Sequence, residues 1–102
     1  MSTLHTVNKS PFETQALGSC LAHALEGAAV LMLDDGVYGA LEGASSEASV
    51  KEALGRCKLY ALDADVKARG LDPDRFVEGV EIVDYAGFVQ LATEHDKVQA
   101  WL

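Results

Sequence analysis

The sequence predicts one α/β domain, spanning residues 1–102, built on a mostly parallel sheet of about five strands with helices on both faces. Apolar stretches of strand length alternate with helix-periodic stretches, which is typical of parallel strands joined by right-handed crossovers. The stretch Ala28–Leu33 is apolar at every position, as in a central parallel strand covered on both faces. A length of 102 residues suits a single domain of this doubly wound class.

The first helix has the clearest predicted boundaries in the chain. Ser10 is a suitable N-cap, Pro11 suits the first helical position, and Glu13 completes a capping box. We therefore expect a helix over Pro11–Glu26 that stops at Gly27.

Apolar residues recur on one side of this predicted helix, at the spacing of a face that packs on a sheet. They are Phe12, Ala16, Leu17, Leu21, Ala24 and Leu25. Cys20 lies inside this apolar stripe.

The other elements follow from shorter patterns. Further strands are expected at Thr3–Asn8, Lys58–Leu62, Val80–Val83 and Val98–Leu102. A helical turn at Val37–Leu41, a short helix at Glu47–Gly55, a helix from Asp63 to Gly70 and a helix at Tyr85–Glu94 are expected between them. Asp63 and Asp84 are the predicted N-caps of the last two helices.

Composition and charge exclude several classes of function. The formal net charge of −8 argues against direct binding of nucleic acid, which relies on Lys and Arg to neutralise phosphates. No signal peptide is recognisable, and the longest apolar run is far shorter than the about 20 residues of a membrane span. We expect a cytoplasmic protein with two free thiols.

A small domain with 49% hydrophobic residues also favours a subunit of an oligomer. Trp101 is then expected either to close the core or to contact another subunit.

Asp34, Asp35 and Gly36 follow a predicted strand, at the sheet edge where ligands of parallel sheets bind. Such a pair of carboxylates could bind a metal ion, but no basic residue can be placed beside it. A capping Asp with a turn Gly is therefore the favoured interpretation. The chain has no Gly-x-Gly-x-x-Gly or Walker motif, and its histidines and cysteines do not have zinc spacing. We expect no metal and no organic cofactor.

Cys20 is the one candidate for nucleophilic chemistry. His23 follows three residues later and is its neighbour on the helix surface, where a protonated imidazole would favour the thiolate. Against this, the apolar stripe would raise the pKa of a thiol, and the helix N-terminus is too far away to lower it. The pattern alone favours a buried, structural Cys20. Cys57, with no charged arrangement recognised around it, is also expected to be structural.

Several blocks of the sequence resemble the TusB/DsrH family of sulfur-relay subunits. They are Leu4–Thr6, Ser10–Phe12, Leu33–Val37, Leu59–Asp65, Ala68–Leu71 and Val83–Val89, in the same order and with little insertion. The resemblance implies a Rossmann-like, DsrE-type fold. It also implies assembly with DsrE/TusD-type and DsrF/TusC-type subunits into a heterohexamer, with sulfur carried as a protein-bound persulfide.

The cysteine at position 20, inside the predicted first helix, makes the chain similar to the DsrH branch of this family. That branch implies a purple sulfur bacterium as the source and dissimilatory sulfur oxidation, with sulfur passed towards a DsrC-type carrier. It also implies that Cys20 is a sulfur-accepting thiol, which His23 could assist. Two alternatives stay open: a TusB-like subunit that serves 2-thiolation of the tRNA wobble uridine through a TusE-type acceptor, and a non-catalytic structural subunit whose partner holds the working cysteine.

Overall fold

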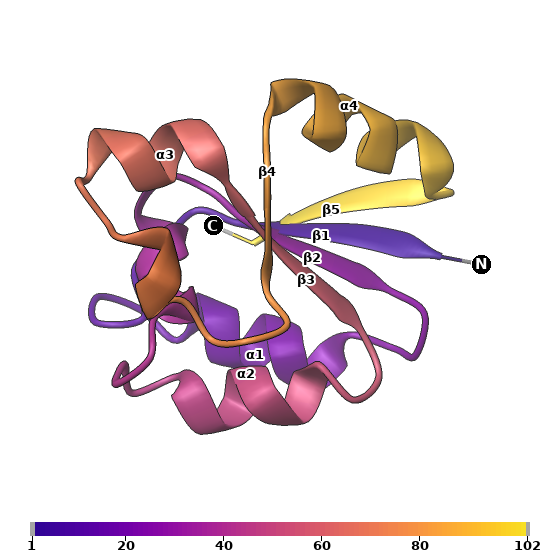
Figure 1. The fold of residues 1–102 in the computed structure, drawn as a ribbon. Coiled ribbons are helices and arrows are strands. Elements are labelled where there is room, and N and C mark those ends of the chain that lie inside the picture. Colours follow the sequence, from indigo (N-terminus) through magenta and orange to yellow (C-terminus); the bar gives the residue numbers. More distant parts are fainter. Residues whose placement is uncertain (1, 102) are drawn as a thin grey trace.

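Five parallel strands form the central sheet of the computed structural model, which describes residues 2–101 (Figure 1). The order across the sheet is β4-β3-β2-β1-β5. The strands are β1 (Thr3–Val7), β2 (Ala29–Met32), β3 (Lys58–Leu62), β4 (Glu81–Val83) and β5 (Lys97–Trp101). This confirms the α/β class and the expected parallel pairing. Leu102, predicted to end the last strand, lies outside the described residues.

Helices lie on both faces of the sheet, as expected. In Figure 1, α1 (Ala16–His23) and α2 (Glu47–Ala53) lie below the sheet and α4 (Tyr85–Glu94) lies above it. The remaining helical segments are α3 (Asp63–Ala68) and two 3₁₀ helices, η1 (Asp34–Ala40) and η2 (Pro73–Arg75). No helix within residues 2–101 is both long and apolar enough to cross a membrane.

The two sheet faces bury cores of different size. The larger core lies between the sheet and helices α1 and α2, and includes Cys20, Cys57, Val30 and Met32. The smaller core lies between the sheet and α4, and includes Leu4, Leu31 and Leu91. All four residues of β2 are buried, so the continuous apolar run predicted a doubly covered strand correctly.

The predicted start of the first helix was wrong. The carbonyl oxygen of Ser10 accepts hydrogen bonds from the amides of Glu13 and Thr14, and its hydroxyl accepts from the amide of Phe12. These contacts close a turn that does not continue as a helix. The N-cap of α1 is Gln15, which makes no side-chain cap. Ser10 is buried. The residues after it form the loop that connects β1 to α1.

The predicted apolar stripe is correct within the observed helix and at Ala24, the C-cap residue, which is buried. Leu17, Cys20 and Leu21 are buried, but α1 ends at His23. Phe12 and Leu25 lie in the flanking loops and are 68% and 76% exposed. Because neither residue is helical, the helical spacing does not place them on the sheet.

Of the N-caps predicted for the last two helices, one is correct. Asp84 accepts a hydrogen bond from the amide of Gly87 at 2.8 Å and caps α4. Asp63 is not a cap, because β3 runs directly into α3 and Leu62 occupies the N-cap position. Asp63 instead pairs with Lys67 at 2.9 Å, one turn along the helix.

Candidate functional site

Cys20 lies in the middle of α1 and points into the larger core. Its exposed fraction is 0%. Burial raises the pKa of the Cys20 thiol to about 12, and nearby Cys57 contributes to the rise. Because the thiolate is the nucleophilic form, Cys20 in this conformation is a protonated core residue. The burial favoured by the apolar stripe is confirmed.

His23 lies on the exposed side of α1. Its Nδ1 is 2.8 Å from the carbonyl oxygen of Ser19, so Nδ1 carries the proton and donates it. The ring also lies 5.7 Å from the indole of Trp101, measured between ring centroids. No hydrogen bond joins His23 to Cys20 in the described part of the chain. Neighbouring positions on the helix surface therefore do not make a thiol–imidazole pair in this conformation.

Cys57 has the charged neighbour that the sequence reasoning missed. The Nη1 atom of Arg56 lies 3.7 Å from its sulfur, and the thiol donates to the carbonyl oxygen of Leu25 at 3.4 Å. Burial raises the pKa of the Cys57 thiol, while the Arg56 guanidinium opposes the rise. Cys57 also lines a hollow of about 610 Å³. Of the two cysteines, Cys57 is therefore the one with access to a surface cavity.

The acidic pair after β2 has a basic partner that the sequence reasoning did not place. Arg69 contacts Asp35 at 2.9 Å and Asp65 at 3.5 Å. The other oxygen of Asp65 accepts a hydrogen bond from the amide of Asp34 at 2.8 Å. No group of carboxylates, histidines and cysteines suitable for a metal ion occurs within residues 2–101. This edge of the sheet is an ion-paired junction between η1 and α3.

Residues 9–98 match the family model described as DsrH like protein. This chain belongs to the TusB/DsrH family. The family comprises sulfur-relay subunits, so the resemblance inferred from the sequence blocks is confirmed.

The curated relatives cover nearly the whole chain. Protein TusB of Escherichia coli O81 (strain ED1a) is 37% identical over 98 residues, which are 96% of this chain and 99% of that protein. Protein TusB of Escherichia coli (strain K12) is 36% identical over the same share of both chains.

Two solved structures share the fold. The ychN protein of Escherichia coli has a TM-score of 0.81 and 18% identity, over 98% of this chain and 99% of that one. A protein of unknown function from Methanobacterium thermoautotrophicum has a TM-score of 0.75 and 19% identity, over 96% of both chains. At these identities the likeness concerns the fold alone.

Proposed function

We propose that this chain is a cytoplasmic subunit of a heterohexameric sulfur-relay complex, where it shapes the assembly while the working cysteine belongs to a partner. The partners are DsrE/TusD-type and DsrF/TusC-type subunits. Membership of the TusB/DsrH family supports the complex. The single observation that carries the non-catalytic role is the complete burial of Cys20, because a shielded, protonated thiol does not attack sulfur.

Exposed apolar side chains supply surface for such contacts. They are Phe12, Leu25, Tyr85, Val89 and Val98. Tyr85 and Val89 lie one turn apart on α4, so they form a small apolar face that a partner subunit could cover.

The test is sulfur transfer through the reconstituted complex, with Cys20→Ala in place of the native chain. We expect the complex to form and to transfer sulfur at the native rate. Cys57→Ala is the matched control, since it removes the other buried thiol. If the complex with Cys20→Ala stayed intact but lost sulfur transfer, the Cys20 thiol would have to take part in the transfer.

A second candidate role makes Cys20 itself the sulfur-accepting thiol, with His23 stabilising its thiolate. The presence of a cysteine at this position, as in the DsrH branch, favours it. The thiolate of Cys20 would attack the outer sulfur of a partner's persulfide. A new S–S bond would form on Cys20, the old S–S bond would break, and the partner's thiolate would leave. No metal or organic cofactor takes part. With Cys20 buried, the step requires that α1 move away from the sheet in the complex.

Mass spectrometry distinguishes this role from the first. The assembled complex is incubated with a persulfide donor and digested. A mass increase of about 32 Da on the Cys20 peptide supports the carrier role. An unmodified Cys20 beside a modified partner cysteine would rule it out.

For the pathway, we propose dissimilatory sulfur oxidation with transfer towards a DsrC-type carrier, supported by the DsrH-like position of Cys20. The TusB relatives favour the alternative, 2-thiolation of the tRNA wobble uridine through a TusE-type acceptor. The two differ in the acceptor, so labelled sulfur on the complex should pass to a DsrC-type protein. Transfer to the TusE-type acceptor instead would favour tRNA thiolation. In either case we propose that the chain does not contact nucleic acid directly, and its net charge of −8 supports this.

A further inference from the structure

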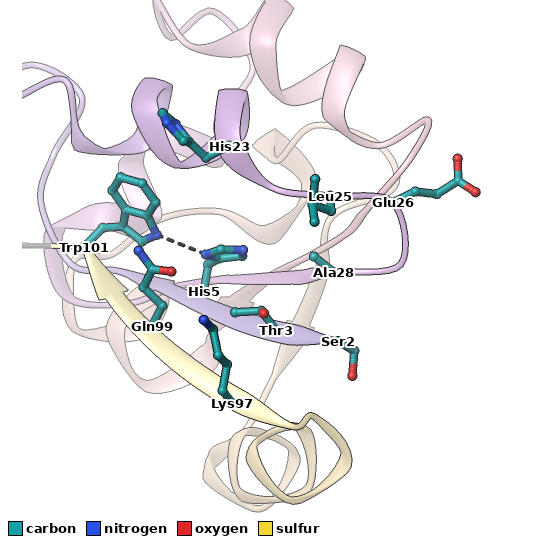
Figure 2. Close-up of a pocket in the computed structure, with 10 residues that line it drawn as sticks. All are labelled: Ser2, Thr3, His5, His23, Leu25, Glu26, Ala28, Lys97, Gln99 and Trp101. Atoms are coloured by element: carbon teal, nitrogen blue, oxygen red, sulfur yellow. Dashed lines mark hydrogen bonds between the residues drawn. The ribbon is translucent and has the colours of Figure 1, made fainter.

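A cavity of about 250 Å³ lies between α1 and the edge strand β5 (Figure 2). Its floor comes from β1 and β5, where the parallel register places Thr3 beside Lys97 and His5 beside Gln99. Its walls come from His23 at the end of α1 and from the loop that follows. The side chains that line it are Ser2, Thr3, His5, His23, Leu25, Glu26, Ala28, Lys97, Gln99 and Trp101. Neither cysteine is among them.

The hydrogen bond between Trp101 and His5 fixes the tautomer of the imidazole. The indole nitrogen of Trp101 lies 3.1 Å from Nδ1 of His5. Because an indole N–H only donates, Nδ1 is the acceptor and is unprotonated. The proton of the neutral ring is therefore on Nε2. Burial and the charge of Lys97 lower the pKa of His5, which keeps the ring neutral.

No hydrogen bond joins the Nε2–H group of His5 to a protein acceptor within residues 2–101, and this nitrogen is open to the cavity, because the one fully buried side-chain nitrogen or oxygen without a partner in that range is Asn8 Oδ1. Figure 2 shows this nitrogen on the side of the ring away from Trp101, facing the part of the cavity that Leu25 and Ala28 border. The cavity thus contains a donor of fixed position without an acceptor.

The charge around this donor favours an anion. Lys97 lines the same cavity and makes no ion pair within the described residues. Glu26 is the one carboxylate that residues 2–101 contribute to the lining, and its side chain points away from the rest in Figure 2. The charges of Lys97 and Glu26 cancel formally, so the positive charge is confined to the part of the cavity where Lys97 lies near His5, away from the Glu26 side chain.

We infer that this cavity binds a small organic carboxylate. His5 Nε2–H and the Lys97 ammonium group hold its oxygens, as a fixed donor and a mobile charge. The indole of Trp101 and the side chain of Leu25, which is otherwise 76% exposed, contact its apolar part. The volume lies just below the range of about 300–1,000 Å³ that is usual for ligand pockets, which suits a molecule the size of benzoate.

Trp101 is the single tryptophan of the chain, so its fluorescence reports on this cavity. Benzoate titrated into the full chain should change the emission in a saturable manner. Benzamide, which has the same shape without the charge, should bind at least about tenfold more weakly. Acetate, which has the charge without the ring, should also bind more weakly. A response to benzamide equal to that of benzoate, or no saturable response, would overturn the inference.

Substitutions locate the binding. Lys97→Gln should weaken benzoate binding about fivefold, as expected for a partly exposed ion pair, and Lys97→Arg should restore most of it. Lys9→Gln is the matched control, because Lys9 is exposed and lies outside the cavity. In native protein, benzoate should also shift the ¹⁵N resonance of His5 Nε2, which requires no substitution. An unshifted His5 resonance, or equal effects of the two lysine substitutions, would place the ligand elsewhere.

Discussion

The guanidinium of Arg56 donates from Nη2 to the carbonyl oxygen of Leu21 at 2.6 Å, across 35 positions of sequence. Its Nη1 donates to the carbonyl oxygen of Ala24 at 2.5 Å, and Glu52 pairs with the same side chain at 2.9 Å. The last carbonyls of a helix have no partner within the helix. Arg56 therefore caps the carboxyl end of α1 and ties it to the segment that follows α2.

Replacing Arg56 tests this cap. Arg56→Leu should lower the free energy of unfolding by about 1.5–3 kcal/mol, because hydrogen bonds from a charged donor to buried carbonyls are lost. Urea denaturation followed by circular dichroism measures the change. Arg75→Leu is the control, since Arg75 is exposed on η2. Equal effects of the two variants would mean that the Arg56 contacts do not stabilise the fold.

The two thiols should differ in accessibility. Cys57→Ala leaves Cys20 as the only thiol, and Cys20→Ala leaves Cys57. At pH 8 and low iodoacetamide concentration, Cys20 in the folded chain should react at least about a hundredfold more slowly than Cys20 in the chain unfolded by urea, because folding shields the thiol and keeps it protonated. Cys57, which lines a cavity, should react faster than Cys20. Faster labelling of Cys20 in the folded monomer would contradict its burial.

Burial of Cys20 also predicts a loss of stability at alkaline pH. Its pKa rises from 9.0 to about 12 on folding, so above pH 9 the unfolded chain releases a proton that the folded chain retains. The free energy of unfolding should therefore fall by up to about 1.4 kcal/mol per pH unit between pH 9 and 12 from this group. Because other groups titrate there, the measurement is the difference between native protein and Cys20→Ala. That difference should shrink as pH rises, and a constant difference would exclude the effect.

Two glycines should respond oppositely to alanine. A β-carbon at Gly36 would lie 2.1 Å from the carbonyl oxygen of Val7, whereas one at Gly18 would meet nothing within 4 Å. Gly36→Ala should therefore destabilise the fold, by about 2 kcal/mol or more. Gly18→Ala should stabilise α1 by about 0.5–1 kcal/mol, since alanine is the better helix former. Thermal melts of both variants measure the contrast, and a Gly36→Ala variant as stable as the native chain would contradict the close approach of η1 to β1.

The strands and their direction were predictable because their signal is local. The apolar run of β2 and the alternation of strand and helix depend on neighbours in the sequence, and so does the Asp84 cap of α4. The start of α1 was not predictable in the same way. Ser10, Pro11 and Glu13 have the local chemistry of a helix start, yet the path from β1 to the sheet face uses them in a turn.

The candidate sites depended still more on tertiary contacts. Sequence periodicity predicted that Cys20 is buried, but it could not reveal that Arg69 joins Asp35 and Asp65. Nor could it reveal that Trp101 bonds to His5 across 96 positions. The Asp35–Arg69 and His5–Trp101 pairs join different elements of the fold, so no short-range pattern records them, whereas Asp65 and Arg69 are four residues apart.

By itself, the sequence determined the α/β class, the parallel strands, the family and the apolar setting of Cys20, since these follow from hydrophobic periodicity and from blocks of residues in order. Only the tertiary structure decided that His23 lies beside Trp101 and that Arg56 reaches the carbonyl oxygens of Leu21 and Ala24. It also decided that the Nε2–H group of His5 faces a cavity and not a protein acceptor. The physical reason is that hydrogen bonds and charges act over a few ångströms in space, and the packing of distant segments sets which groups come that close.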